Sequence, residues 1–298
     1  MLISVLICTY DRGILINDTL DALINKQTRE PDEIVVVNGG GTNNCQEILR
    51  KWNLRFPKLI VIETENLNLA RSRNVGLQYC KGDLILQTDD DARPLSDWIE
   101  KIIFFHRKYP EYGVIGGAVF DKNIKTLLSL ISDVITFPNY SNPREVRNVP
   151  GVNSSYKKRV IKEIGEYDET LFRGEDVDYN WRAIQKGWKV LYHPEVKVHH
   201  MHRSTWKGLF YQHYMYGRAH YLVRSKWENM YSPYPKKITS FYFLLKWAAS
   251  WTWIPIFDAH RKAKKISMFP NGFDILIIFL INLTNRFGSY YQRNMVKK

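Results

Sequence analysis

The segment Gly82-Asp-Leu-Ile-Leu-Gln-Thr-Asp-Asp-Asp-Ala92 joins a short apolar run to three consecutive acids, Asp89 to Asp91. Adjacent carboxylates at the end of a buried run repel one another and lose hydration, so they need a compensating partner. A divalent cation is one such partner, because Mg²⁺ and Mn²⁺ favour carboxylates together with a phosphate-bearing ligand. A solvated acidic turn before a helix is the alternative, since Ser96-Asp-Trp-Ile99 is typical of a helix start. These residues alone favour neither interpretation.

The chain before this segment alternates between apolar strands and helical patterns. Strands are expected at four places, with helices between them: residues 2–8, 33–38, 59–63 and 84–86. This alternation predicts βαβ units and a mostly parallel α/β sheet, which binds ligands outside the carboxyl ends of its strands. Polar segments follow three of these strands, at Thr9 to Arg12, Asn38 to Gly41 and Asp89 to Asp91. Their convergence on one edge favours the cation.

The glycine run at 39–41 has two interpretations. It lacks the G-x-G-x-x-G spacing of a dinucleotide-binding loop. A flexible turn fits the run, and so does a backbone that lets a base or ribose approach closely.

Further polar groups come later in the chain. Residues 121–148 show no clear period, and we expect an insertion over the site. Small polar residues at 149–156 are expected at the same edge. Gly174-Glu-Asp176 opens a helix, where acids are favoured by the helix dipole whether or not they have a catalytic role. Four positions separate Asp178 from Arg182, which predicts a structural ion pair on that helix.

Three histidines, His199, His200 and His202, follow two short predicted strands at 188–192 and 195–199. A metal site, a phosphate clamp and chance all fit this cluster, although histidines gathered at a strand end are more often functional. No cysteine accompanies them, which argues against structural zinc.

Composition separates the chain into two parts. The net charge is +13, and residues 201–298 carry 16 lysines and arginines against three acids, which accounts for the whole excess. This asymmetry predicts a neutral catalytic domain joined to a basic attachment region. Three scattered cysteines argue for a reducing compartment. The apolar N-terminus lacks the basic flank of a signal peptide and is expected to form a strand, so we expect a cytoplasmic protein.

Together these pieces resemble the family 2 glycosyltransferases, which have the GT-A nucleotide-sugar fold. The resemblance covers residues 2–205 and rests on six segments in order: Ile7-Cys-Thr-Tyr-Asp-Arg12, Ile34-Val-Val-Val-Asn38, Asn66 to Gly76, Thr88-Asp-Asp-Asp91, Gly174-Glu-Asp176 and Val198-His-His200. It implies a GT-A (Rossmann-like) catalytic domain at 1–205, flanked by helices. Residues 206–298 are then a basic, aromatic-rich helical region.

The resemblance also assigns roles to individual residues. It implies a nucleotide site at Thr9, Tyr10, Arg12, Asn38, Gly39, Arg73, Asn74, Asp89 and Asp90, with Arg73 near the diphosphate. It implies Mn²⁺ or Mg²⁺ bound by Asp91 and His200. It implies a catalytic pair, Glu175 and Asp176, with Asp176 as the base. Contacts to the acceptor or to neighbouring groups of the site are expected at Asn153, Ser154, His202 and Trp206. His202 is also the alternative to His200 as the metal or phosphate ligand. The family has Asp where this chain has Asn38, which leaves uridine and guanosine both open.

These residues suit one reaction. A metal at Asp91 stabilises charge on the leaving diphosphate, and Asp176 takes the proton of the attacking hydroxyl. One direct displacement inverts the anomeric centre. The family's processive members carry Q-x-x-R-W, whereas Tyr211-Gln-His-Tyr-Met-Tyr-Gly-Arg218 has no Arg-Trp, so transfer of a single sugar is expected.

The last third contains two long apolar stretches, 241–257 and 275–283, on either side of Arg261-Lys-Ala-Lys-Lys265. Both fall short of the ~20 apolar residues of a spanning helix. Tryptophan-rich apolar faces beside basic clusters are typical of helices at an anionic membrane interface, and we expect a peripheral enzyme on the inner face of the cell membrane with a lipid-linked acceptor. Packing on the catalytic domain or in a homodimer is the alternative for these helices.

Two other functions compete with this one. A soluble glycosyltransferase would use a saccharide or protein acceptor. A scaffold without catalysis could bind nucleic acid or a membrane through its basic, aromatic surface. Nucleic-acid binding leaves the acids at 89–91 and 175–176 without a purpose, so we expect no nucleic-acid partner.

Overall fold

The computed structural model describes residues 1–41, 44–121, 124, 126–227, 229–230, 240–266 and 271–296. Contacts divide the chain into two compact units. The first comprises Met1–Lys122 and Phe137–Met201, and the second comprises Asn123–Thr136 and His202–Lys298. Part of the expected insertion at 121–148 therefore groups with the C-terminal residues.

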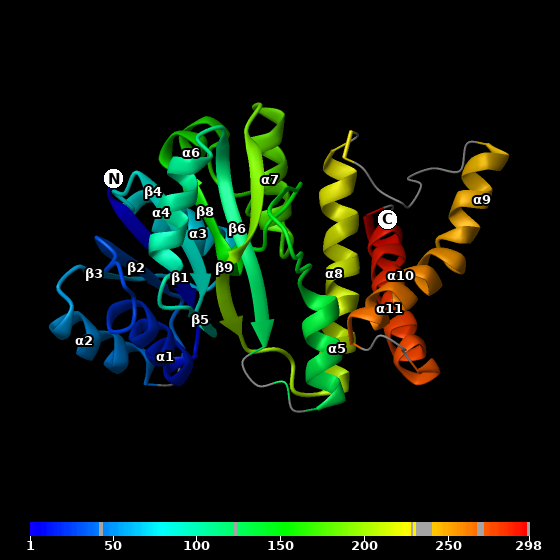
Figure 1. The fold of residues 1–298 in the computed structure, drawn as a ribbon, viewed down its shortest axis with the longest axis horizontal. Helices are drawn as coiled ribbons and strands as arrows, with labels where there is room; N and C mark the ends of the chain where they lie inside the picture. The colour runs from blue at the N-terminus through cyan, green and yellow to red at the C-terminus, as the bar shows by residue number, and fades with distance from the viewer. Residues whose placement is uncertain are drawn as a thin grey trace. The chain divides into compact units, whose positions relative to one another are not determined.

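The first unit is built around a sheet in the strand order β3-β2-β1-β4-β8-β6-β9-β5, with β7 beside β9 (Figure 1). Its first four strands are β1 (Ile3–Thr9), β2 (Glu33–Asn38), β3 (Leu59–Glu63) and β4 (Leu84–Asp89). They are parallel, as the alternating pattern predicted. Thr9 lies beside Asn38 and Cys8 beside Asp89, so three of these strands end at one edge.

The second half of the sheet is mixed. It contains β5 (Ala92–Pro94), β6 (Tyr112–Asp121), β7 (Arg144–Glu145), β8 (Ser154–Lys157) and β9 (Lys189–His200). Only β6 and β9 pair in parallel here, and the other pairs are antiparallel, including β4 with β8. The prediction of two short strands at 188–199 was wrong, because a register shift opposite Gly117 and Ala118 lets β9 continue as one irregular strand.

Helices cover both faces of this sheet. One face packs against α1 (Gly13–Ile24), α2 (Cys45–Arg55) and α4 (Trp98–Lys108). The other packs against α3 (Leu69–Tyr79), α6 (Lys158–Ile164) and α7 (Glu175–Gln185). Within β1, Val5 and Ile7 belong to the first core and Leu6 to the opposite one, as period-two alternation requires. Burial on both faces explains the nearly continuous apolar runs of these strands.

The second unit is helical. It consists of α5 (Leu127–Thr136), α8 (Trp206–Lys226), α9 (Phe241–Ala249), α10 (Trp253–Ile266) and α11 (Gly272–Val296). A small apolar cluster joins α5, α8, α10 and α11. Where α8 and α11 cross, a Cβ at Gly217 would lie 1.7 Å from the carbonyl oxygen of Asn285, so glycine is what permits this close approach. Within the described part of the chain, none of the helices combines the length and the apolar character needed to cross a membrane.

Candidate active site

Asp89, Asp91 and His200 form a cluster suited to a metal ion. Asp89 ends β4, Asp91 lies in the turn that follows, and His200 ends β9, which pairs with β5 through Ala92. One potential ligand atom from each residue lies within 4.8 Å of the others, and His200 Nε2 is 3.1 Å from Asp91 Oδ1. Mn²⁺ binds both carboxylate and imidazole ligands, and Mg²⁺ binds carboxylate ligands.

The two carboxylates of this cluster are in different electrostatic environments. Burial raises the pKa of Asp89, and the charges of Asp91 and Asp176 add to this effect against Arg73. Burial also acts on Asp91, but the hydrogen bond and charge of His200 and the charge of Arg12 outweigh it, so its pKa is lowered. Asp91 is therefore the acid whose charged form the protein stabilises most at this turn.

The side chain of Asp90 contacts different residues from those that contact Asp89. Its carboxylate accepts hydrogen bonds from Thr9 Oγ1 at 2.8 Å and from Arg12 Nη1 at 3.0 Å. Burial raises its pKa to about 6 against the opposing charge of Arg12. Arg12 Nη1 also lies 2.9 Å from Asp91 Oδ2. Thr9 and Arg12, expected to contact a nucleotide, thus hold the acidic turn in place in this structure.

Thr19 also fixes this turn, and its role was missed from the sequence. Its fully buried hydroxyl lies 2.7 Å from the carbonyl oxygens of both Asp90 and Ala92. A hydroxyl has one proton, so it donates to one of them at a time. A threonine within an apolar helical pattern gives no signal of such a contact.

The ends of β1 to β3 form a second polar group. Asn38 is buried, and its side-chain amide donates to Glu63 Oε2 at 2.8 Å while its oxygen accepts from the backbone of Gly40. Glu63 is exposed and lies beside Asn38 in register, which places a carboxylate next to position 38. Tyr10 is half exposed nearby in sequence. Glu63 was not anticipated, because its pairing with Asn38 depends on strand register.

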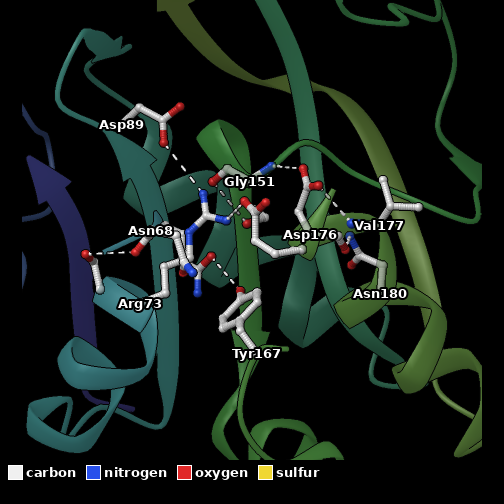
Figure 2. Close-up of polar contacts among 12 residues, drawn as sticks. Asn68, Arg73, Asp89, Gly151, Tyr167, Asp176, Val177 and Asn180 are labelled. Carbon is white, nitrogen blue, oxygen red and sulfur yellow. Dashed lines mark hydrogen bonds and ion pairs between the residues drawn. The ribbon is translucent and has the colours of Figure 1, made fainter. Parts of the chain in front are cut away.

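Arg73 on α3 connects two acidic elements (Figure 2). Its buried guanidinium lies 2.5 Å from Glu175 Oε1 through Nη1 and 3.7 Å from Asp89 Oδ1 through Nη2. Burial disfavours the charged guanidinium, but Glu175 and Asp89 raise its pKa. Burial raises the pKa of Glu175, opposed by Arg73. Glu175, expected in the catalytic pair, is thus a buried partner of Arg73.

The neighbour of Arg73, Asn74, is likewise fully engaged within the protein. Its amide donates to the carbonyl oxygen of Tyr167 at 3.0 Å and to Glu169 Oε1 at 2.9 Å, and its oxygen accepts from the backbone of Tyr167 at 2.7 Å. Expected at the nucleotide, Asn74 here holds the loop that leads to α7.

Asp176 is the more accessible acid of the Glu175–Asp176 pair. Gly174 precedes α7 in the left-handed conformation (φ 79°), and Asp176 lies in the first turn. One of its carboxylate oxygens accepts from the backbone of Gly151 at 3.0 Å and the other from that of Val177 at 2.8 Å (Figure 2). These contacts fix the carboxylate while the side chain stays partly exposed. The predicted ion pair between Asp178 and Arg182 is confirmed, at 3.0 Å.

Asn153 and Ser154 lie in the interior, contrary to their expected place beside an acceptor. Both are fully buried. The Asn153 amide donates to the carbonyl oxygens of Ala118 and Val196, and its oxygen accepts from Trp98 Nε1 at 2.9 Å. Small polar residues at 149–156 thus satisfy backbone groups where strands of the mixed sheet meet, which the sequence pattern does not reveal.

His202 and Trp206 belong to the second unit. His202 Nε2 lies 3.3 Å from Asp133 Oδ1 on α5, and its ring is almost completely buried. Trp206 is the first residue of α8 and is partly exposed. Of the three histidines, His200 alone belongs to the metal cluster found among the described residues.

A family model described as glycosyl transferase family 2 matches residues 4–165, more than half of the chain. The protein belongs to this family and is a glycosyltransferase. Its first unit has the GT-A architecture, a mixed α/β Rossmann-like sheet flanked by helices.

Similar proteins agree with this assignment. A glucosyl-dolichyl phosphate glucuronosyltransferase of Haloferax volcanii is 26% identical over 237 residues, which are 70% of this chain and 75% of the relative. A poly-β-1,6-N-acetyl-D-glucosamine synthase of Staphylococcus epidermidis is 22% identical over 263 residues, 85% of this chain but only 63% of the relative. A mannosyltransferase from Pyrobaculum calidifontis, solved in complex with GDP-Man and Mn²⁺, has a TM-score of 0.67 at 16% identity, covering 97% of this chain and 87% of that chain.

Proposed function

We propose that this glycosyltransferase moves one sugar from a UDP- or GDP-sugar to a hydroxyl group, with inversion at the anomeric carbon. The cluster of Asp89, Asp91 and His200 carries the proposal, because it gathers metal-binding groups at the edge where the strands end. These three residues would hold Mn²⁺ or Mg²⁺. When bound, the cation supplies positive charge that stabilises the diphosphate leaving group. The mannosyltransferase solved with GDP-Man and Mn²⁺ supports a nucleotide-sugar donor.

The protein's own contribution to the reaction is general-base catalysis. The acceptor oxygen forms a bond to the anomeric carbon while the bond from that carbon to the β-phosphate oxygen breaks. The acceptor proton passes to the carboxylate of Asp176, which the backbone of Gly151 holds in place. Arg73 pairs with both Asp89 and Glu175, the neighbour of Asp176, which supports placing both ends of the reaction in one site.

The nucleotide would lie along the ends of β1, β2 and β4. Tyr10 offers an exposed ring to a base, Gly39 lets the backbone approach closely, and Asn38 with Glu63 offers hydrogen-bonding groups. Thr9 and Arg12 support this edge through their hydrogen bonds to Asp90, whereas Asn74 holds the loop that leads to α7.

The acceptor that we propose is lipid-linked. The glucuronosyltransferase relative is named for a dolichyl phosphate substrate, which supports this class. The synthase relative is named for a polysaccharide, so a saccharide acceptor is the competing proposal. We also propose that single sugars are transferred, because Arg-Trp is missing after Gln212.

A membrane surface is the partner proposed for the second unit, on the cytoplasmic face of the cell membrane. On α10, Trp253 and Phe257 are 64% and 69% exposed, and the basic residues Arg261, Lys264 and Lys265 follow them, also exposed. No residue of α9 is buried, and its Phe241 is 73% exposed. Aromatic groups beside lysine and arginine favour an anionic interface.

A thermal-shift panel of UDP- and GDP-sugars, each with and without Mn²⁺, tests the proposed activity. Binding to the folded state raises the melting temperature, by an amount that depends on ligand concentration over Kd. We expect a rise with one nucleotide class, dependent on Mn²⁺, and release of the nucleoside diphosphate on incubation. A panel in which no nucleotide sugar shifts the melting temperature or is turned over would contradict the proposal.

A further inference from the structure

Arg73 occupies an unusual place for a residue expected at a diphosphate. Its guanidinium is buried and lies between carboxylates of two different elements, Asp89 at the end of β4 and Glu175 at the start of α7. A buried cation is retained only where its charge and its N–H groups are satisfied, and breaking such a pair leaves an uncompensated charge. Arg73 is therefore committed to the protein's own acids.

The surroundings of Arg73 restrict its movement. Its Cζ lies 5.6 Å from the centre of the Tyr167 ring, which stacks on Tyr179 at 3.7 Å. On another side is the backbone of Gly151, where a Cβ would lie 2.5 Å from Arg73 Nη2 and 3.0 Å from Cζ. Any side chain at position 151 would displace the guanidinium.

Gly151 connects this arginine to the proposed base. Its backbone N–H donates to Asp176 Oδ2 at 3.0 Å (Figure 2). Gly151 thus contacts Arg73 and also holds the carboxylate of Asp176. Glu175, next to Asp176 in the chain, pairs with Arg73 directly. Asp89, at the other end of the guanidinium, is one of the three residues of the metal cluster.

We propose that Arg73 is a positioning residue that fixes the distance between the metal-binding edge and the base, and that it does not bind the donor itself. The proposal rests on the proposed function, since it takes Asp176 as the base. Arg73 gains and loses no proton in the reaction; it holds Asp89 and the first turn of α7 so that the leaving group and the attacking hydroxyl are aligned. A misplacement of about 1 Å by a residue away from the reacting atoms can cost ~100-fold in rate.

A double-variant cycle of Arg73→Lys and Glu175→Gln tests this role. The rate is measured as release of nucleoside diphosphate from the sugar nucleotide that the thermal-shift panel identifies, with Mn²⁺. Binding of UDP or GDP with Mn²⁺ is measured in parallel by calorimetry. We expect each single variant to lower kcat by ~100-fold with the nucleotide Kd changed less than about 3-fold. The double variant should be no slower than the singles, whereas independent residues would multiply to ~10⁴-fold.

Arg71→Gln is the matched control, because Arg71 lies on the same helix and its side chain makes an exposed pair with Glu169 at 3.5 Å. It should keep the wild-type kcat. If Arg73→Lys does not fold, Gly151→Ala replaces it, since it leaves Arg73 present but pushes on its guanidinium; the same loss of kcat is expected.

Three results would overturn the proposal. A raised nucleotide Kd with unchanged kcat would make Arg73 a donor ligand. A lower melting temperature with unchanged kcat would make it purely structural. Full activity of Asp176→Asn, measured in the same series, would rule out Asp176 as the base and would overturn both proposals. If Asp176→Asn is inactive and either of the first two results is found, only the positioning role of Arg73 is overturned.

Discussion

At the scale of single residues, the neighbouring acids Asp90 and Asp91 differ in the partners that their carboxylates contact. Asp91 faces His200, and Asp90 accepts from Thr9 and Arg12. Only Asp89 belongs to β4; Asp90 and Asp91 lie in the turn that follows, where their side chains reach different partners. The acidic triplet therefore combines a candidate metal ligand, Asp91, with an internal hydrogen-bond acceptor, Asp90.

This difference predicts distinct effects for two conservative variants. Asp91→Asn removes a charged ligand, so Mn²⁺ affinity in calorimetry and the turnover rate should both fall, by ~100-fold or more. Asp90→Asn should leave Mn²⁺ affinity nearly unchanged and instead lower the free energy of unfolding by about 1–3 kcal/mol, because Thr9 and Arg12 lose a charged acceptor. Equal loss of Mn²⁺ affinity in both variants would contradict this division.

Asp176→Asn tests the base directly. The amide keeps the shape of the side chain but cannot take the acceptor proton, so turnover should fall by 10²–10⁴-fold, roughly the range for general-base catalysis. The Kd of the nucleotide with Mn²⁺ should stay at the wild-type value. An Asp176→Asn enzyme with full turnover would show that another group accepts the proton.

The proximity of Asp91 and His200 could be predicted from residue types and order, whereas Asp89 was expected at the nucleotide and lies in the same cluster; the internal contacts could not be predicted. Asp89 ends β4 and His200 ends β9, and the antiparallel pairing of β9 with β5, which begins at Ala92, brings His200 beside the turn that holds Asp91. The burial of Asn153 and the pairing of Arg73 with Glu175 depend on segments far apart in the sequence. A local sequence pattern does not show whether a polar side chain is hydrogen-bonded inside the protein or faces a ligand.

At the scale of elements, α8 and α11 depend on two glycines. A Cβ at Gly288 would lie 2.0 Å from the carbonyl oxygen of Tyr214, just as one at Gly217 would meet Asn285. Gly288→Ala should separate the helices and lower the free energy of unfolding by about 1–3 kcal/mol, an overpacking cost.

Chemical denaturation followed by circular dichroism measures this loss. Gly272→Ala is the matched control on the same helix, because no atom of the described residues lies within 4 Å of a Cβ there. Equal stability of the Gly288 and Gly272 variants would show that the crossing is looser than described.

A buried histidine on α4 predicts that acid destabilises the first unit. Burial lowers the pKa of His106 to about 3, and its Nε2 lies 2.9 Å from Ser155 Oγ on β8. In the unfolded chain the pKa is near 6.5, so the unfolded state binds more protons between about pH 3 and 6.5, and stability is lost as the pH falls through that window.

Between pH 7 and pH 5 this group should remove about 2 kcal/mol from the free energy of unfolding. Urea denaturation at both pH values measures the loss, and His106→Gln should reduce the pH dependence by that amount. A variant with the same pH dependence as the wild type would mean that the pKa of His106 is the same in the folded and unfolded states.

The elements themselves were predictable to different degrees. The four parallel strands and their helices followed from apolar runs and helical spacing, because both faces of the sheet are buried. Helix α5 was missed, since residues 121–148 show no clear period, and β9 was divided in two because Pro194 and Glu195 interrupt its apolar pattern.

At the scale of the whole molecule, charge and exposed aromatic residues are concentrated in the C-terminal third. The first 200 residues are neutral, and the last 98 carry the entire excess of +13. This difference in net charge between the two parts of the chain could be calculated from the sequence. The degree of exposure of Trp253, Phe257 and Phe241 could not, because it depends on how little apolar surface the helices bury together.

Liposome flotation tests the proposed membrane partner. The wild-type protein should float with vesicles of anionic and zwitterionic lipid mixed, and less at high salt. Lys264→Gln with Lys265→Gln should weaken this binding by about 1 kcal/mol per charge. Trp253→Ser with Phe257→Ser should also weaken it, through loss of apolar burial.

Leu54→Ser is the control for these variants, because Leu54 is 78% exposed on α2 of the first unit and should not affect flotation. If all variants float as well as the wild type, the membrane assignment of α10 is wrong. If the Trp253 and Phe257 variant instead converts a dimer into a monomer in ultracentrifugation, these side chains form an interface between copies.

Removal and return of the metal test the central claim most directly. Protein dialysed against EDTA is incubated with the donor sugar nucleotide, and released UDP or GDP is measured by chromatography before and after Mn²⁺ is added, for the wild type and for His200→Ala. We expect no release without metal, full release by the wild type with Mn²⁺, and a strongly raised Mn²⁺ requirement for His200→Ala. Release that persists in EDTA, or a His200→Ala enzyme with the wild-type Mn²⁺ requirement, would contradict a metal-dependent glycosyltransferase centred on Asp89, Asp91 and His200.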